Sequence, residues 1–221
     1  MGKIIYGILS PLVRLFTPRM KTVWDVPYDG EPCIFVGNHD RANGPISAGT
    51  KFPLRKNCYI WIYANAMDRK LVPAYVRQDY WWNPEDRLAP LYDRTIPYLT
   101  ALVLPPILKS VPNVPVYHEM KAMTTLRQSM KLLEAGNSLF IFPGIPDGYR
   151  SHSETKINEG FLCLLPMYHK KTGKTLKIWP MHMDRHTFHV KAPIAFDPEL
   201  PLQDQIPELC RKISAAIEED R

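Results

Sequence analysis

Two short segments, about a hundred residues apart, hold the side chains best suited to chemistry. Residues 35–40 (FVGNHD) end an apolar run in a histidine and an acid, and residues 140–144 (FIFPG) end a second run in a turn-forming pair. In an open α/β sheet, ligands collect beyond the carboxyl ends of the strands. A histidine at such an end can take a proton from a substrate hydroxyl. We therefore expect His39 to lie in a ligand-binding site.

Short apolar runs predict the strands that would position these segments. Strands are expected at residues 32–36, 58–63, 138–142, 176–181 and 187–191. Because predicted strands alternate with predicted helices, the sheet should be at least partly parallel. We therefore expect an α/β fold with a single domain, in which helices flank a mostly parallel or mixed central sheet.

Helical periodicity predicts the elements between the strands. Apolar side chains recur at helical spacing at Met120, Met123, Leu126, Met130 and Leu133, and Gly136 follows as a terminator. A helix is expected over 157–171 before Gly173, with a kink or an early end at Pro166. A final amphipathic helix carries Ile206, Leu209, Cys210, Ile213 and Ile217. We expect an N-terminal amphipathic segment over 1–21 and one domain over 22–221.

The composition is that of a globular protein, with 45% hydrophobic and 23% charged residues in a chain of 221. The 22 prolines cluster around 73–115 and 193–207, where they predict extended segments and turns rather than long regular helices. The net charge of +6 suits an anionic partner, such as a phosphorylated substrate, a lipid surface or a nucleic acid. The sign of the charge alone does not choose among these partners.

The cysteines indicate reduced thiols in a cytoplasmic protein. Cys33, Cys58, Cys163 and Cys210 have no metal-type spacing, and no signal peptide with a small-residue cleavage site precedes the domain. A second group, His182, Asp184, His186 and His189, contains metal-type side chains. These residues flank predicted strands, whereas ligands four positions apart converge on a helix. We therefore expect no metal site.

Residues 4–16 are mostly apolar, but Pro11 and Arg14 interrupt a run that is far shorter than the ~20 residues needed to span a bilayer. With Lys3, Arg19 and Lys21 nearby, this segment fits an interfacial helix on an anionic leaflet. It fits a terminal helix packed on the domain equally well. We expect a peripheral protein on the inner face of the membrane.

A second apolar stretch, 96–108, contains three prolines and is also too short and irregular to span a bilayer. Aromatic side chains surround it: Tyr59, Trp61, Tyr63, Tyr75, Tyr80, Trp81, Trp82, Tyr92 and Tyr98. An interfacial belt, a core and a ligand cleft all use such residues. Charges lie among them at Arg77, Asp79, Asp86, Arg87 and Arg94. These charges favour a core or a cleft.

Four sequence blocks follow one another along roughly residues 20–200. They are 38–44 (NHDRANG), 114–118 (VPVYH), 142–151 (FPGIPDGYRS) and 178–180 (IWP). Their order resembles that of the glycerolipid acyltransferases of the lysophosphatidic acid acyltransferase (1-acyl-glycerol-3-phosphate acyltransferase) kind. That family carries NHxxxxD, a block ending in arginine, FPEGTRS and a late Ile/Val-Pro pair. The resemblance implies a glycerol-3-phosphate acyltransferase-like fold.

The resemblance also implies an activity, in which an acyl group moves from a thioester donor to a lysophospholipid or another hydroxyl acceptor. Acyl-CoA or acyl carrier protein would be the co-substrate, with no further cofactor. His39 would act as general base, and Asp40 is the nearest acid that a turn could bring to its ring. The substrate-binding residues implied by the blocks are Arg41, Asn43, His118, Phe142, Pro143, Gly144, Asp147 and Arg150. If residues 147–151 (DGYRS) match the end of the family block after three inserted residues, Arg150 is the best phosphate ligand among them, because a guanidinium offers paired donors.

The chain departs from the family pattern at three positions. Gly44 stands where the family has the aspartate that orients the histidine, and losing such a carboxylate costs on the order of 10⁴ in rate unless another acid replaces it. Gly144 stands at the FPE glutamate if the block has no gap, and the arginine of the second block falls on Tyr117 or His118. A non-catalytic relative that binds lipid or acyl carrier is therefore the alternative. Asp40, Asn43 and Gly44 also suit a turn and N-cap before a helix.

Other activities lack a sequence pattern to support them. The chain has no Gly-x-Ser-x-Gly elbow, no P-loop and no Gly-x-Gly-x-x-Gly after a strand. No nucleic-acid-binding module accompanies the mild basic excess, which is common on proteins that meet phospholipid head groups. We therefore expect the partners to be the thioester donor, the hydroxyl acceptor and a membrane surface, and not nucleic acid.

Overall fold

The computed structural model describes most of the chain. The described residues are 11, 19–38, 43–78, 82–83, 85–117, 121–144, 157–184 and 186–218, and of 43–46 only the backbone is described. Every structural statement below refers to these residues.

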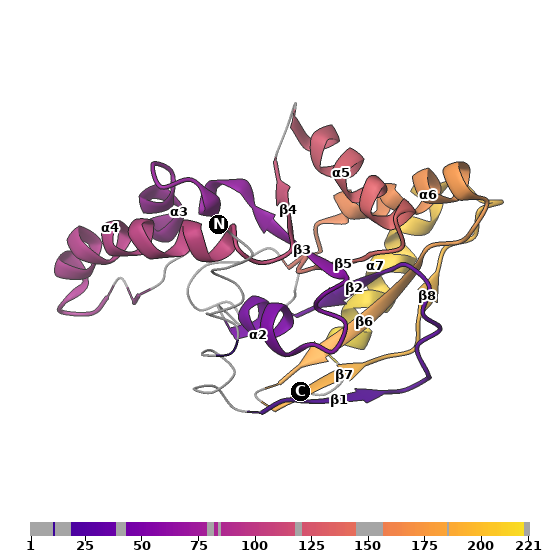
Figure 1. Cartoon of the computed structure of the whole chain (residues 1–221), viewed down its shortest axis with the longest axis horizontal. Helices are drawn as coiled ribbons and strands as arrows, with labels where there is room; N and C mark the ends of the chain where they lie inside the picture. Colours follow the sequence, from indigo (N-terminus) through magenta and orange to yellow (C-terminus); the bar gives the residue numbers. More distant parts are fainter. Residues whose placement is uncertain are drawn as a thin grey trace.

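An eight-stranded mixed sheet forms the centre of the molecule (Figure 1). Its strands are β1 (Lys21–Trp24), β2 (Cys33–Gly37), β3 (Cys58–Tyr63), β4 (Asn113–Val116), β5 (Ser138–Ile141), β6 (Lys177–Met183), β7 (Thr187–Val190) and β8 (Ile194–Ala195). The order across the sheet is β1-β7-β6-β2-β5-β3-β4, and β8 pairs with β6. The five strands from β6 to β4 in this order are mutually parallel, whereas β7 and β8 run antiparallel to β6.

Helices connect the strands and cover both faces of the sheet. The α-helices are α2 (Asn43–Lys51), α3 (Val72–Gln78), α4 (Ala89–Leu108), α5 (Ala122–Glu134), α6 (Leu164–Thr172) and α7 (Leu202–Glu218). Two 3₁₀ helices, η1 (Ala64–Met67) and η3 (Glu159–Cys163), precede α3 and α6. Figure 1 shows α5, α6 and α7 on one side of the sheet, with α2 on the other. The predicted α/β domain with a mixed sheet and flanking helices is confirmed.

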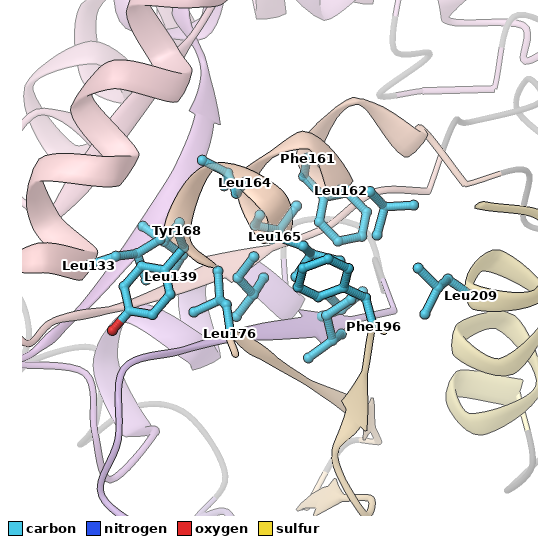
Figure 2. Packing of buried hydrophobic residues seen from close by; sticks show 14 of the residues in the cluster. Leu133, Leu139, Phe161, Leu162, Leu164, Leu165, Tyr168, Leu176, Phe196 and Leu209 are labelled. Carbon is cyan, nitrogen blue, oxygen red and sulfur yellow. The ribbon is translucent and has the colours of Figure 1, made fainter. Parts of the chain in front are cut away.

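The alternation of side chains along β2 divides the core in two. Ile34 and Val36 point to the face covered by α5, α6 and α7, where the packing in Figure 2 includes Leu133, Phe161 and Leu209. Cys33 and Phe35 point to the opposite face, where Phe35 meets Phe52 at the end of α2 with ring centroids 5.0 Å apart. Because side chains alternate along a strand, one buried run of five residues holds both layers to the sheet.

The direction of the connections changes at β2, which is why a site belongs there. From β2 the chain crosses by α2 to β3 on one side, and from β5 it crosses back by α6 to β6 on the other side. Right-handed crossovers in opposite directions place their helices on opposite faces, and α2 and α6 do lie on opposite faces. Ligands bind in open α/β sheets at such a reversal.

Most of the elements expected from periodicity are confirmed within a residue or two. These are β2, β3, β5, β6, β7, α5 and α7, with Gly136 in a left-handed conformation after α5. The helix expected over 157–171 is split into η3 and α6, so Pro166 lies in the first turn of α6, where its missing N–H costs nothing. Asn43 and Gly44, which suit a turn and N-cap together with Asp40, are the first two residues of α2, and Asp40 lies outside the described residues.

The expectation that the prolines exclude long helices is wrong for α4. This helix runs for 20 residues and contains Pro97, Pro105 and Pro106. Pro97 has no N–H for the carbonyl of Asp93, one turn earlier. The Arg77 side chain replaces that donor, because its Nη2 donates to the Asp93 backbone carbonyl oxygen at 3.0 Å. Its Nε donates to the Asp93 side-chain carboxylate at 2.8 Å.

The stretch 96–108, expected in a core or a cleft, has one buried and one exposed face. Pro97, Ala101 and Pro105 are buried, and Ala101 packs with Val72 and Val76 of α3. The opposite face of α4 is exposed. In the described part of the chain, no helix combines the length and the apolar character needed to cross a membrane.

Candidate functional site at the carboxyl edge of β2 and β5

The two segments that hold the predicted chemistry leave the sheet side by side. β2 and β5 are adjacent and parallel, with Val36 opposite Ile141 in the register. Asn38 and Pro143 therefore follow neighbouring strand ends. Both residues line one pocket, together with Gly37 and Gly144.

Asn38 is tied to the end of β6 by two hydrogen bonds. Its side-chain Nδ2 donates to the Met183 carbonyl at 3.0 Å, and its Oδ1 accepts from the Met183 N–H at 2.6 Å. The side-chain amide thus takes the place of a peptide group and extends the pairing of β2 with β6 beyond the last register pair, Gly37 with Met181. The direction in which the chain leaves β2 is consequently fixed by β6.

Gly37 allows the strand end to lie directly against an aromatic ring. A Cβ at this position would lie 3.0 Å from Cε1 of Phe140 and 3.3 Å from Cε of Met183. The ring is held in turn, because Phe142 stacks on Phe140 with centroids 4.8 Å apart. A side chain at position 37 would therefore push on the residues that shape both strand ends.

Two residue pairs join the end of β5 to the start of η3. The Pro143 carbonyl accepts a hydrogen bond from the Asn158 N–H at 2.9 Å, and Gly144 forms an antiparallel bridge with Ile157. Asn158 also caps η3 by accepting from the Gly160 N–H at 3.1 Å. Gly144 and Ile157 therefore both line the pocket.

The last turns of α7 form the opposite wall of this pocket, through Ser214, Ile217 and Glu218. His182 of β6 holds that helix in place, because its Nδ1 lies 2.6 Å from the Ile217 carbonyl oxygen and its ring is buried. The volume of about 10 Å³ between the described walls is room for about one water molecule.

The two remaining sequence blocks lie on opposite sides of the central strands. Residues 178–180 are in β6, adjacent to β2. Residues 114–116 are in β4, which is separated from β2 by β5 and β3, so strand spacing alone puts them roughly 14 Å apart. Thr125 of α5 secures the end of β4, donating to the Pro115 carbonyl at 2.9 Å and accepting from the Tyr117 N–H at 3.1 Å.

The predicted site residues divide into two groups. Phe142, Pro143 and Gly144 are at the carboxyl edge, and Asn43 is the first residue of α2. The others lie outside the described residues: His39, Asp40, Arg41, His118, Asp147 and Arg150. Their predicted roles remain predictions, and what the described residues provide is the position from which His39 continues the chain.

The histidine and aspartate residues near the end of β6 have structural partners. Asp184 accepts hydrogen bonds from the N–H groups of His186 at 2.6 Å and Thr187 at 2.7 Å, which closes the turn between β6 and β7. Burial alone would raise the pKa of Asp184, but these two hydrogen bonds and the nearby histidines hold its pKa below the usual value. Among the residues that the structure describes, no three metal-type side chains gather in one place.

Sequence reasoning missed the structural role of Asn38 and the contribution of α7 to the pocket. The periodicity of α7 gave its buried face correctly, including Leu209, Ile213 and Ile217. This periodicity does not indicate which strand ends the helix contacts, because those contacts depend on the order of the strands in the sheet. The two hydrogen bonds of Asn38 likewise depend on the position of β6, which is distant in sequence.

Comparison with known proteins gives one distant resemblance. No protein-family model matches the chain, and no curated protein matches it. Among solved structures, the chain is similar to the 1-acyl-sn-glycerophosphate (LPA) acyltransferase PlsC from Thermotoga maritima. The identity is 16%, the TM-score is 0.42, and the match covers 96% of this chain and 80% of that one. The residues of this chain, rather than that resemblance, must therefore support its function.

Proposed function

We propose that this protein transfers an acyl group from a thioester to a hydroxyl of a lysophospholipid or a related acceptor. One observation carries the proposal: the blocks at 38–44 and 142–151, distant in sequence, start from adjacent parallel strand ends and share a pocket. The block at 178–180 is on the other neighbour of β2. If these blocks form an active site as in the glycerolipid acyltransferases, they must come together in the folded chain.

In the proposed reaction, His39 is the general base. Its imidazole takes the proton of the acceptor hydroxyl as that oxygen forms a bond to the thioester carbonyl carbon. The bond from that carbon to sulfur then breaks, and the imidazolium returns the proton to the departing thiolate. The products are an ester and a free thiol, so the histidine is unchanged after each cycle.

Two further roles belong to the proposal. Asp40 orients the His39 ring in place of the family aspartate, since position 44 is glycine. Arg150 binds the acceptor phosphate through its paired N–H donors, with Asp147 in the same segment. Gly144 and Ile157, the described residues that precede and follow 145–156, both line the pocket, which supports a role for these two residues in substrate binding. Acyl-CoA or acyl carrier protein supplies the thioester.

A non-catalytic protein that binds lipid or acyl carrier is the second candidate. The glycines at positions 44 and 144 favour it, because each stands where the family has a carboxylate. The two candidates differ in turnover. A binding protein would form stoichiometric complexes with the acyl carrier or the lipid and release no free thiol.

The test is the release of free thiol by the purified chain, supplied with acyl-CoA donors of several lengths and with lysophosphatidic acid or another lysophospholipid. Product formation by mass spectrometry identifies the ester. Arg150→Ala should raise KM for the phosphate-bearing acceptor at least tenfold, with little change for a neutral alcohol acceptor. Release of thiol without ester product would contradict acyl transfer to a hydroxyl.

A further inference from the structure

A mostly apolar face of α4 is exposed, with Thr95 as the polar residue within it. Leu91, Tyr98, Leu99, Leu102 and Val103 are between 55% and 63% exposed, and their spacing puts them on one side of the helix. Surface hydrophobic residues that occur singly need no explanation, but a contiguous row of large ones marks an interaction surface.

The other side of α4 is already occupied. Ala101 packs with Val72 and Val76 of α3, and Ile96 and Leu104 lie against the same cluster. Arg77 adds the two hydrogen bonds to Asp93, and its guanidinium lies 5.6 Å from the centroid of the Tyr98 ring. The helix is therefore held in place on one face, and a rigid apolar face remains on the other.

Exposed positive charges lie beside the apolar face of this helix and at its ends, and the one acid within the helix is ion-paired. Within α4 the charged residues are Asp93, which is ion-paired with Arg77 at 2.8 Å, and Arg94, which is exposed. Lys109 and Arg87 are exposed at the two ends of the helix. Glu85 and Asp86, which precede Arg87, confine negative charge to the amino end. Leucine and tyrosine flanked by arginine and lysine fit the boundary between acyl chains and anionic head groups.

The position of α4 relates this face to the candidate site. β3 ends at Tyr63 and continues directly into η1, which α4 contacts, so α4 is at the carboxyl edge of the sheet. Figure 1 shows α3 and α4 side by side, projecting away from the layer of α5, α6 and α7. A flat partner that meets the exposed face of α4 would thus lie on the same edge of the sheet as the end of β2.

We propose that the exposed face of α4 docks on the surface of an anionic phospholipid membrane. The leucines enter the acyl-chain boundary, while Arg94 and Lys109 contact lipid phosphates. A second copy of the chain and the N-terminal residues 1–18 are the competing occupants. The idea that docking brings the lipid acceptor to the candidate site rests on the proposed function, whereas the docking itself does not.

The test is co-sedimentation of the full chain with vesicles of phosphatidylcholine, with and without phosphatidylglycerol. The double variant Leu99→Ser/Leu102→Ser should bind mixed vesicles at least tenfold more weakly. Met123→Ser/Leu200→Ser is the matched control, because both of its side chains are also about half exposed but lie on other elements. Arg94→Gln should reduce the preference for phosphatidylglycerol. Circular dichroism checks folding, and Leu99→Ser alone replaces the double variant if that does not fold.

Two results would overturn the proposal. The first is vesicle binding by Leu99→Ser/Leu102→Ser equal to that of wild type, which would leave residues 1–18 as the attachment. The second is a wild-type dimer in light scattering that the double variant converts to monomer, which would make a second copy the occupant. Vesicle binding that depends on α4 in a protein without acyl transfer would support docking and contradict only the proposed function.

Discussion

The Asn38 side chain stands in for a peptide group at the point where β2 ends. Its amide both donates to and accepts from Met183, at 3.0 and 2.6 Å. Asn38→Asp keeps the acceptor but places a carboxylate against the Met183 carbonyl oxygen. We predict a loss of about 1–3 kcal/mol in the free energy of unfolding at neutral pH, measured by urea denaturation.

Asn158→Asp is the matched control for this substitution. The Asn158 side chain accepts from the Gly160 N–H as an N-cap, which a carboxylate does equally well. Its stability should stay within about 0.5 kcal/mol of wild type. Equal stability of both variants would mean that Asn38 does not hold the end of β2.

The space around the Cα of Gly37 is too small for a methyl group without a shift of its neighbours. In Gly37→Ala the new Cβ would meet the Phe140 ring at 3.0 Å, and that ring is stacked on Phe142. We predict destabilisation by about 1–3 kcal/mol in thermal or urea unfolding. In Gly49→Ala, within α2, the closest atom is the terminal methyl carbon of Ile60 at 3.2 Å, and alanine favours a helix. That control should be neutral or more stable, and a reversed order would contradict the packing described for the strand ends.

The two site segments could be predicted from the sequence, but their position next to each other in the sheet could not. A buried apolar run followed by polar residues predicts a strand end, so the segments after β2 and β5 could be named in advance. Their adjacency follows from the chain passing from β2 to β3 before β5 inserts between them. That order depends on packing across the whole sheet and has no local signal at Asn38 or Pro143.

Helix α4 shows how a long helix tolerates prolines when another element supplies the missing donor. Pro97 leaves the Asp93 carbonyl without its N–H, and Arg77 of α3 donates to it. We predict that Arg77→Met lowers the free energy of unfolding in the wild-type background. In a Pro97→Ala background the alanine N–H can bond the Asp93 carbonyl itself, so Arg77→Met should lower the free energy of unfolding by less than it does in the wild type.

A double-mutant cycle from urea denaturation measures this coupling. Arg94→Met is the control, because Arg94 is exposed on the same helix and donates to no helix carbonyl among the described hydrogen bonds. Additive effects of Arg77→Met and Pro97→Ala would refute the role of Arg77 as a substitute donor.

Element prediction succeeded where periodicity was strong and failed where it was absent. The amphipathic helices α5 and α7 were predicted because their apolar positions repeat at helical spacing. The edge strands β1 and β8 are four and two residues long and only partly buried, so they carry no pattern to detect. Helix α4 was missed because proline counts as a helix breaker unless the tertiary donor is known.

The whole fold gives its cysteine thiols three different environments. Cys33 and Cys58 are buried in the sheet, Cys210 is partly buried and Cys163 is exposed. Burial raises the pKa of Cys33 to about 12, and the thiol donates hydrogen bonds to the hydroxyl oxygens of Ser138 and Tyr28. A folded-state pKa above the unfolded value near 9 means that stability is complete below pH 9 and is lost as the pH rises toward 12.

We therefore predict three classes of thiol in alkylation followed by mass spectrometry. Cys163 should react first and Cys210 more slowly, while Cys33 and Cys58 should react only as the protein unfolds. Wild-type protein should also lose thermal stability between pH 9 and 11 more steeply than Cys33→Ala. Rapid alkylation of Cys33 in the native protein, or parallel pH profiles of the two proteins, would contradict this account.

The central claim is that the imidazole of His39 accepts the proton of an acceptor hydroxyl. Its most direct test is kcat/KM for acyl transfer from a thioester to a lysophospholipid, compared between wild type and His39→Ala. His186→Ala is the control, because His186 is exposed in the turn before β7 and its hydrogen bonds to Asp184 and Lys21 are made by its backbone, which alanine keeps. The account predicts a loss of roughly 10²–10⁴-fold for His39→Ala and an unchanged rate for the control. Equal rates for His39→Ala and wild type would contradict it.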